Sequence, residues 1–491
     1  MIKDYGKFSA IDQKIKSGEI AAAREQLKVL SGKSKSRPDK LIISELSRRV
    51  GLPESALHLL FKHVREIGDA TAEEKFEYAL SLMKLGYYRE GRELLERAEL
   101  RALDRSLYYS AFADIYHWDY ESAEKKLAVY RKQNLPEYEA LVVDVNLLAC
   151  KVMAGNPSDA VLKDIELILK VGGKLNAYRL MANALELSAQ YSLYAGLNDS
   201  AEKALKQAGK ILSEDSSIDG FFIKKWRSLS DLKEHRNEKK FVDRVLATRK
   251  EAFQLSYWEV ARDIDFHLGL WNRNRSVTSH LYFGTPFEHY RKRVAKYFGP
   301  AVTREQTYTW RLNQPSRPKL MLDLDSGDLV TAATGKNIAC ELSGNTHFLR
   351  TLRSLSRDFY RPARISSMAE VLYPGEYFEP HSTQNKVHQT IHRLRTALLK
   401  AKVPLEVTER DGYKLVTSEP FGLVSYMNYS DNEDPAKMLK QKFHHNLFTS
   451  EEASIVLNMS KRGVQTLLGD LVADNRLQKI GLGRSVKYKF I

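Results

Sequence analysis

The sequence contains only two cysteines in 491 residues and no apolar stretch of the roughly 20 residues that a membrane-spanning helix needs. Its first residues, MIKDYGKFSAIDQKIKSGE, carry neither an apolar core nor a cleavage pattern for secretion. Cys150 and Cys340 both lie in apolar patterns, so we expect buried thiols rather than a disulfide framework. These absences predict a cytoplasmic protein that has no membrane partner.

The sequence also lacks the motifs by which many enzymes bind nucleotides, metals or substrates. There is no Walker A loop, no dinucleotide-binding glycine fingerprint, no GxSxG elbow and no HExxH pair. His388 and His392 have the spacing of one helix face, but the Cys/His set of a structural zinc site does not accompany them. We therefore expect no enzymatic activity, no catalytic residue, no cofactor and no metal site.

Positive charge is present in excess, and the excess is unevenly placed. The net charge is +15 at pH 7. Residues 1–260 hold 43 basic and 39 acidic side chains, whereas residues 261–491 hold 34 basic and 23 acidic side chains. A basic second part beside a nearly balanced first part favours a nucleic-acid-binding module joined to a module of another kind.

A short pattern recurs through the first half: a glycine, four residues, and then a small residue that opens a helix. Its six occurrences, one of them with tryptophan in place of glycine, are Gly18/Ala23, Gly51/Ala56, Gly86/Gly91, Trp118/Ala123, Gly155/Ala160 and Gly196/Ala201. The small residues follow one another at intervals of 33, 35, 32, 37 and 41 residues. A small residue lets two helices cross closely, and glycine permits the tight turn between them. Over roughly residues 5–215 the chain resembles the tetratricopeptide (TPR) repeat family, which implies a stacked α-solenoid.

The TPR resemblance implies a groove that holds a protein segment or a small ligand. The aromatic and polar candidates for this groove are Tyr78, Tyr108, Tyr109, Tyr116, Asn146, Tyr178, Asn183 and Tyr191. Aromatic residues at helical spacing are more often core residues, and that alternative stays open. Ile43–Val64 also has the pattern of a DNA-binding helix-turn-helix, although its Gly51 and Ala56 fall in step with the repeats.

A basic bridge over residues 263–306 follows the repeats. Its cationic side chains are Arg273, Arg275, Arg291, Lys292, Arg293 and Lys296. Two interpretations are equally open: an arm on the DNA backbone, or a solvated helix and linker.

The most informative stretch runs from Asn385 to Val416. Four apolar residues at helical spacing are expected to face a core: Val387, Ile391, Leu394 and Leu398. Polar and cationic residues then occupy the other faces of this helix. Asp411-Gly412 is a hairpin turn signal between two short strands. A cationic helix followed by a basic hairpin is what a winged helix offers to the grooves of DNA.

From roughly Thr307 to Val416 the chain resembles the OmpR/PhoB-type winged helix of bacterial response regulators. The match rests on Val387, Ile391, Arg393-Leu394-Arg395 and Gly412-Tyr413, with strands expected in Lys319–Leu342 and two helices after them. The wing departs from the family pattern, because acids flank Arg410 and glycine is scarce. By this resemblance the loop Tyr373–Ser382 takes the place where such regulators contact RNA polymerase. The alternative is that its aromatic residues, Tyr373, Tyr377 and Phe378, cover the domain core.

We assign base reading to the side chains at the head and along the exposed faces of this helix. They are Thr383, Gln384, Lys386, His388, Gln389, His392 and Arg393. Glutamine can pair with adenine, and arginine or lysine with guanine, in the major groove. Phosphate contacts are expected from Arg395, Arg410 and Lys414.

A second pattern of the same order closes the chain. Thr449-Ser-Glu-Glu452 is a capping box that opens a helix, and a turn, a second helix and a glycine-bearing hairpin follow. This order resembles the small winged helices of many bacterial regulators, which bind DNA or serve in dimerisation and docking. The resemblance implies DNA contacts from Ser460, Lys461, Arg462, Gln465, Thr466, Arg484 and Lys487.

The predicted fold is mainly α, a TPR-like α-solenoid followed by two α+β winged-helix domains. The predicted boundaries are 1–262 for the solenoid, 263–306 for the linker, 307–420 for the first winged helix and 421–491 for the second. We predict a DNA-binding transcription regulator of a bacterium, with double-stranded DNA and RNA polymerase as partners and a protein or small ligand in the solenoid. A homodimer is left open.

The parts resemble those of the SARP activators in inverted order and without a nucleotide-binding domain, so the SARP mechanism does not carry over. Two alternatives stay open beside this prediction. One is a TPR scaffold whose winged helices hold proteins together, and the other is a DNA-organising protein of low sequence specificity.

Overall fold

The computed structural model describes residues 6–490 except 17–18, 34–35, 104, 156–158, 213–217, 236–237, 305, 313–317, 374–375, 427–434, 444–445, 458–460, 474–475, 482 and 484–485. Most described residues are helical, as predicted. They form two compact units: unit 1 comprises Met1–Gly91, Gln306–Ser356 and Pro362–Ile491, and unit 2 comprises Arg92–Glu305 and Arg357–Arg361. The predicted solenoid is therefore divided between the two units. None of the described helices is both long and apolar enough to cross a membrane.

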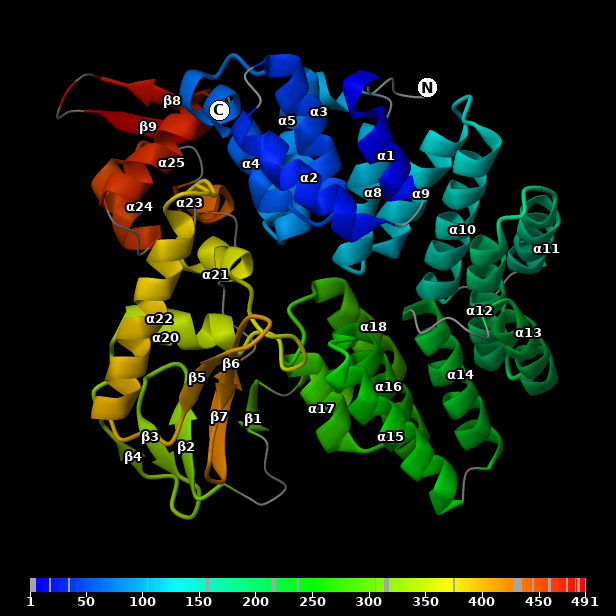
Figure 1. Cartoon of the computed structure of the whole chain (residues 1–491). Helices are drawn as coiled ribbons and strands as arrows, with labels where there is room; N and C mark the ends of the chain where they lie inside the picture. Colours follow the sequence, from blue (N-terminus) through cyan, green and yellow to red (C-terminus); the bar gives the residue numbers. More distant parts are fainter. Residues whose placement is uncertain are drawn as a thin grey trace. The chain divides into compact units, whose positions relative to one another are not determined.

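Unit 1 begins with the helices of the first repeats. They are α1 (Ser9–Lys16), α2 (Ile20–Lys33), α3 (Arg37–Arg49), α4 (Pro53–Phe61), a π-helix (Lys62–Ile67), α5 (Ala72–Leu85) and the start of α6 (Tyr88–Leu95) (Figure 1). Thr71 caps α5 in a capping box with Glu74, and Glu74 also forms an ion pair with Arg37 of α3. Caps of this kind satisfy the free N–H groups at a helix start, so they fix where α5 begins.

The turns between paired helices have the backbone that the repeat pattern predicts. Gly51, Gly86, Gly155 and Gly196 have φ angles of 80°, 95°, 72° and 81°. Trp118, which stands where the pattern substitutes tryptophan for glycine, has a φ of 63°. A positive φ is uncommon outside glycine, so the turn geometry at Trp118 supports its assignment to the repeat.

The small residues of the pattern lie where helices approach each other. Ala23, Ala56, Gly91, Ala123 and Ala201 are buried. At Gly91 an added Cβ would lie 2.6 Å from Cγ of Met83 and 3.0 Å from the carbonyl oxygen of Ala79. Close crossing therefore requires a glycine at this position.

Ala160 is the exception, and our expectation for it is wrong. It is exposed, whereas its neighbour Val161 is fully buried. Helix α11 (Asp159–Lys174) turns Val161, Ile165 and Ile168 toward the core, so the buried face begins one residue later than the pattern predicts.

Unit 2 is also built from helical pairs. Its helices are α7 (Ala98–Arg101), α8 (Ser106–Tyr116), α9 (Tyr120–Arg131), α10 (Glu137–Ala154), α11, α12 (Tyr178–Ala195), α13 (Asn198–Ile211), α14 (Ile218–Glu234), α15 (Lys239–Gln254), α16 (Trp258–Asn272), α17 (Arg275–Phe283), α18 (Glu288–Phe298) and α19 (Pro300–Thr303). Neighbouring helices from α10 to α14 lie side by side (Figure 1). Ser256 between α15 and α16 has a φ of 60° and Ala261 is fully buried, so a further repeat stands there with serine in the glycine position.

The predicted bridge over residues 263–306 is packed helix within unit 2. Helices α16, α17 and α18 contact one another, and Arg291 and Arg293 are partly buried. Arg293 donates a hydrogen bond to the hydroxyl of Tyr194 at 2.7 Å. Arg273, Arg275, Lys292 and Lys296 are exposed.

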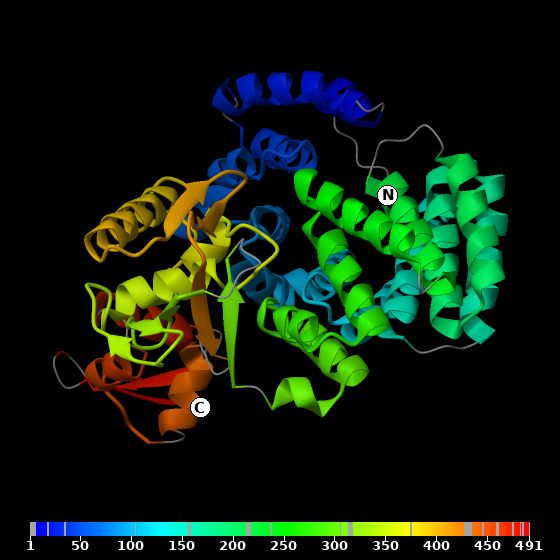
Figure 2. The same cartoon turned by 90° about the horizontal axis from the view of Figure 1, so that it is seen from below.

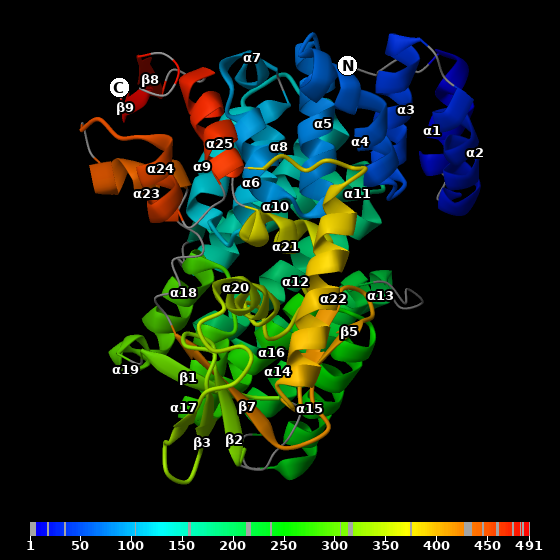
Figure 3. The ribbon, with the colours of Figure 1, turned by 90° about the vertical axis from the view of Figure 1, so that its left-hand side faces the viewer.

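The rest of unit 1 contains a five-stranded sheet in the order β1-β7-β2-β3-β4. The strands are β1 (Thr307–Arg311), β2 (Leu320–Asp323), β3 (Leu329–Thr331), β4 (Asn337–Ile338) and β7 (Phe421–Tyr426). Between β4 and β7 the chain forms α20 (Thr346–Leu355), α21 (Ile365–Leu372), α22 (Thr383–Lys400) and a hairpin of β5 (Glu406–Glu409) and β6 (Tyr413–Val416). Figures 2 and 3 show the hairpin beside α22, which also contacts α20 and α21.

Two expectations in this region are wrong. The predicted boundary at residue 420 ends the first winged helix too early, because β7 lies beyond it and pairs with β1 and β2 within the five-stranded sheet. Cys340 was expected to be buried, but it is half-buried and its thiol donates to the carbonyl of Gly327 at 3.2 Å. Cys150 is buried, as predicted.

The C-terminal part has the predicted order of helices and hairpin. It contains α23 (Pro435–Phe443), α24 (Ser450–Leu457), α25 (Lys461–Ala473), β8 (Leu477–Ile480) and β9 (Lys487–Phe490). The capping box is confirmed, because the amide of Glu452 donates to the Thr449 hydroxyl and the amide of Thr449 donates to the Glu452 carboxylate. Helix α23 falls in the stretch for which we expected no helix, and its Leu439 belongs to the core of this part.

Both hairpins are attached to their helices by the same device. A single residue ahead of the middle helix forms a two-way backbone bridge with the second hairpin strand: Ala363 with Tyr413, and Phe448 with Tyr488. Each bridge gives the hairpin a third strand at one point, which fixes its direction relative to the helices.

Candidate nucleic-acid interface

Helix α22 has one buried face and one exposed face. Val387, Ile391 and Leu394 are fully buried and Leu398 is 2% exposed, so the predicted core face is confirmed. The 18 residues of α22 include no acidic residue. The exposed face is therefore cationic along the whole helix.

The side chains of the exposed face differ in how they are held. Among the described residues, the side chains of Gln389, His392 and Arg393 have no hydrogen-bond or ion-pair partner, and all three are exposed. Lys386 forms an ion pair with Glu376 at 2.8 Å. Arg395 donates from Nε to the carbonyl of Val407 at 3.0 Å, so it ties α22 to the hairpin as well as presenting charge.

The hairpin turn is formed as predicted. Asp411 has a φ of 55° and Gly412 a φ of 122°, and a Cβ at Gly412 would lie 2.9 Å from the carbonyl oxygen of Ala363. Arg410 is exposed at the tip. Lys414 is half-buried, and burial lowers the pKa of its ammonium group. The hydroxyl of Tyr413 hydrogen-bonds Nδ1 of His388, which joins hairpin and helix a second time.

Three of the predicted contact residues are buried, and these assignments are corrected. Thr383 is 5% exposed, and its hydroxyl accepts a hydrogen bond from the amide of Glu379, so it shapes the start of α22 instead of reading a base. Tyr78 is fully buried and Phe378 is 2% exposed. Neither ring is available to an external partner in this structure.

Phe378 is buried because the loop before α22 packs on the first repeats within unit 1. The amide of Phe378 donates to the carboxylate of Glu90 at 2.9 Å, and its ring lies 5.5 Å from that of Tyr87. The hydroxyl of Tyr87 donates to the carbonyl of Glu376 at 2.9 Å. Tyr78 donates to the carbonyl of Phe378 at 3.5 Å.

Arg65 completes this cluster from the π-helix. Its guanidinium lies over the ring of Tyr377, 3.9 Å from the ring centre, and it forms an ion pair with Glu90. Burial raises the pKa of Glu90, and the charge of Arg65 opposes that rise. We call Arg65, Tyr78, Tyr87 and Glu90 the docking cluster.

The start of α22 also meets the first repeats. Gln384 donates to the carboxylate of Glu54 at 2.9 Å, and His381 lies 3.2 Å from His58. A cavity of about 330 Å³ opens beside this contact, and its charged lining residues are Glu54, Lys84, Arg364, Glu409 and Asp411. Gln384 thus faces a carboxylate where we expected it to face a base.

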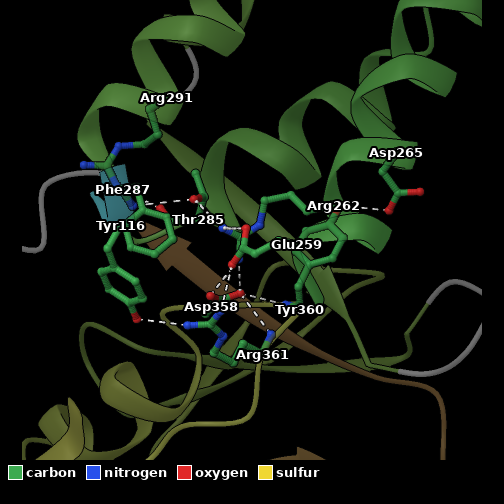
Figure 4. Close-up of polar contacts among 10 residues, drawn as sticks. All are labelled: Tyr116, Glu259, Arg262, Asp265, Thr285, Phe287, Arg291, Asp358, Tyr360 and Arg361. Carbon is green, nitrogen blue, oxygen red and sulfur yellow. Dashed lines mark hydrogen bonds and ion pairs between the residues drawn. The ribbon is translucent and has the colours of Figure 1, made fainter. Parts of the chain in front are cut away.

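The segment between α20 and α21, Arg357–Arg361, belongs to unit 2 and is held there by a buried charge pair. Arg262 of α16 is fully buried, and its Nη2 lies 2.6 and 2.7 Å from the two carboxylate oxygens of Asp358 (Figure 4). Burial opposes the charge on Arg262, but Asp358 and Glu259 outweigh it and raise the pKa of the guanidinium.

Further contacts surround this pair. Tyr360 donates to Asp265 at 2.8 Å, and Arg361 donates to the hydroxyl of Tyr116 at 2.9 Å and to Glu259 at 3.1 Å (Figure 4). We call Arg262, Asp358 and Arg361 the buried anchor. Tyr116, which we assigned to a ligand groove, thus has its hydroxyl engaged within unit 2.

Three of the remaining candidates for a ligand groove lie on three different helices. Tyr109, Asn146 and Asn183 are partly buried on α8, α10 and α12, and Asn146 donates to the carbonyl of Val142 in its own helix. Tyr373 is partly buried and hydrogen-bonds the hydroxyl of Thr390 on α22. Their assignment to a partner stays a prediction.

The second hairpin module has fewer described candidates. Lys461, Gln465 and Lys487 are exposed, and Lys461 forms an ion pair with Glu451 at 3.2 Å. Ser460 and Arg484 lie outside the described residues. Arg462 and Thr466 are placed on α25 only as positions of the helix.

No sequence pattern pointed to the residues of the docking cluster or the buried anchor, apart from Tyr78. Glu90 lies 288 residues before Phe378 in the chain, and Arg262 lies 96 residues before Asp358. Pairing over such distances is a product of the tertiary fold and leaves no local signal.

Comparisons with known proteins give little. No protein-family model matches the chain, and no curated protein matches it. Among solved structures the chain is similar to "Crystal Structure of the Apo Form of RapI", with 12% sequence identity, a TM-score of 0.39, and coverage of 56% of this chain and 84% of that one.

Proposed function

We propose that this protein is a transcription regulator that binds double-stranded DNA through α22 and the hairpin β5–β6. The observation that carries the proposal is the exposed face of α22, which holds no acidic residue. On this face the side chains of Gln389, His392 and Arg393 have no hydrogen-bond or ion-pair partner among the described residues. The order of three helices and a hairpin, with a bridge at Tyr413, supports the proposed winged helix. Helix α22 is supported by its contacts with α20, α21 and β5.

The proposed division of labour follows from the chemistry of the exposed side chains. Arg393 can pair with both acceptors of a guanine, and Gln389 can pair with adenine, when α22 lies in the major groove. Arg410 at the hairpin tip supplies a phosphate contact, which positions the protein without reading sequence. Arg395 supports the site by tying α22 to β5.

The test is selection of bound duplexes from a random pool by the full-length chain, followed by anisotropy titration of the selected duplex at several salt concentrations. We expect a shared motif and a log–log salt slope of about −0.9 for each phosphate contact. Selection of no motif, together with a flat salt response, would refute DNA binding.

The variant that separates α22 from general charge is Arg393→Ala. Loss of a guanine contact should weaken binding by about 1–3 kcal/mol and relax specificity at one position. The matched control is Lys206→Ala, which removes the same charge from an exposed position on α13. Equal affinity of the two variants would remove α22 from the mechanism.

A scaffold function has one observation in its favour, which is the packing of the loop before α22 on the first repeats. In that function the modules would hold proteins and α22 would bind DNA only weakly. Co-precipitation of partners that survives nuclease treatment, combined with failure of the duplex selection, would favour the scaffold. RNA polymerase is the first partner to probe for in that experiment.

A further inference from the structure

The docking cluster holds its occupant chiefly through the main chain. Tyr87 and Tyr78 donate to the carbonyls of Glu376 and Phe378, and Glu90 accepts from the amide of Phe378. Main-chain contacts of this kind fit any extended segment, whatever its side chains.

The specificity of the docking cluster depends on two adjacent aromatic side chains of the segment that it holds. Phe378 is enclosed next to Tyr87, and Tyr377 lies flat on the guanidinium of Arg65 while remaining 39% exposed. One ring is buried and the adjacent ring contacts a cation. Both contacts favour aromatic side chains over aliphatic ones, so together they can hold a segment specifically. The cluster therefore has the chemistry of a site for an extended segment with two adjacent aromatic residues.

The π-helix has a direct role in this site. Residues Lys62–Ile67 wind more widely than an α-helix, and the turn places Arg65 against Tyr78, Glu90 and Tyr377 at once. Such π-helical turns occur often at functional sites. Without Arg65 the buried carboxylate of Glu90 would lose its ion-pair partner.

The occupant leads directly into α22. Glu379 and Ser382 hydrogen-bond each other between Phe378 and the first turn of the helix, and Gln384 in that turn meets Glu54. A seated segment therefore places a carboxylate beside the head of α22, where phosphate would otherwise approach.

We infer that the docking cluster is an exchangeable peptide site. Its internal occupant is Glu376–Phe378, and its external occupant is a segment of a partner protein that presents two adjacent aromatic residues in extended form. When the external segment takes the site, the loop before α22 leaves, and Gln384 separates from Glu54. The effect on DNA binding rests on the function proposed above, whereas the exchange itself does not.

The exchange is tested with a labelled peptide that copies residues 376–382, Glu-Tyr-Phe-Glu-Pro-His-Ser, titrated with the full-length chain. In the wild type the internal segment competes, so the apparent Kd is the intrinsic Kd divided by the open fraction. Phe378→Ala should vacate the site and tighten peptide binding about tenfold or more. Tyr377→Ser, which removes the half-exposed ring, is the second variant and should tighten binding less.

Two controls make the result specific. A peptide in which serine replaces both aromatic residues should not bind, and Tyr87→Phe introduced beside Phe378→Ala should weaken the copied peptide by removing one hydroxyl donor. If folded Phe378→Ala and Tyr377→Ser bind the copied peptide no better than the serine peptide, the inference is overturned.

A second readout separates this inference from the proposed function. Saturating peptide should raise the affinity of the full-length chain for the selected duplex. Exchange of the peptide without any DNA binding by wild type or variant refutes the proposed function and leaves the peptide site standing. DNA binding without peptide binding refutes the inference alone.

Discussion

The helices α20, α21 and α22 are joined by two segments, and each segment is held in a different way. Arg357–Arg361 is held in unit 2 by the buried anchor, in which a fully buried arginine makes a two-pronged contact with Asp358. Glu376–Phe378 is held in unit 1 by the docking cluster, chiefly through hydrogen bonds of its main-chain groups, one of them to the Glu90 carboxylate, and through two rings.

This difference separates a permanent attachment from a reversible one. Separating Asp358 from Arg262 would leave the charged guanidinium fully buried without its closest carboxylate. The buried anchor therefore opens only when the surrounding structure unfolds. The main-chain groups of Glu376 and Phe378 can exchange protein partners for water at little net cost. Of the two segments that flank α21, Arg357–Arg361 is thus attached permanently and Glu376–Phe378 is attached reversibly.

The largest expected effect comes from breaking the anchor. Asp358→Ala leaves the fully buried Arg262 without its closest carboxylate and with the longer 3.3 Å ion pair to Glu259, which should lower the free energy of unfolding by up to about 3–5 kcal/mol. Urea unfolding followed by the fluorescence of Trp226, buried in unit 2, measures it. The control Asp231→Ala breaks an exposed ion pair with Arg244 and should lower it by less than about 1 kcal/mol. Equal losses would show that the anchor is no stronger than a surface pair.

The second-largest effect is expected from low pH, which should destabilise the structure around the buried anchor. His280 packs on Phe359 and Tyr360, and burial lowers its pKa to about 4. An unfolded chain takes up this proton near pH 6.5, so stability falls as the pH drops from about 6.5 to 4, by up to roughly 3 kcal/mol. His280→Gln should flatten urea-unfolding profiles across this window. An unchanged slope would mean that other groups, such as His117 and His267, dominate it.

Hydrogen exchange should distinguish the two attachments without any variant. The amide of Phe378 donates to Glu90, and the amides of Tyr360 and Arg361 donate to Asp358. We expect the Phe378 amide to exchange at least about tenfold faster, because local opening requires less free energy than unfolding of the anchor. Native-state exchange followed by mass spectrometry of short peptides measures this, and equal protection would contradict a reversible docking cluster.

The smallest expected effect concerns the carboxylate at the head of α22. Glu54→Gln should leave stability within about 0.5 kcal/mol, since the contact with Gln384 is exposed. Affinity for the selected duplex should rise by about threefold, because one negative charge leaves the approach of the phosphates. Glu73→Gln, an equal charge change at an exposed position on α5, is the control. A rise of the same size in both variants would point to net charge alone.

The sequence correctly predicted those features that depend on interactions between residues near one another in the chain. Gly18 lies outside the described residues. The other four turn glycines, the tryptophan that replaces one glycine of the pattern, the core face of α22 and the turn at Asp411-Gly412 all follow from backbone sterics and helical spacing, and all are found. The unit at Ser256 falls within the predicted solenoid of residues 1–262, although serine does not mark a left-handed turn as glycine does. The pattern alone could not show that Ala160 lies one residue off the buried face.

Long-range pairing set the limit of prediction from sequence. β7 is a short strand after a turn-rich stretch. Only its pairing with β1 and β2 makes it an interior strand of the five-stranded sheet. Thr383, Tyr78 and Phe378 have the residue types of contact positions, yet packing between distant segments buries them. The docking cluster and the buried anchor join residues far apart in the chain, so no local window contains both partners.

Because unit 1 is built from both ends of the chain, its assembly depends on the order of synthesis. Residues of the docking cluster leave the ribosome long before Glu376–Phe378, with all of Arg92–Glu305 made in between. At roughly 5–20 residues per second, the cluster spends tens of seconds without its internal occupant. During that interval a nascent chain is open to any aromatic segment nearby, so chaperones or the partner itself can meet the site before the rest of the protein exists.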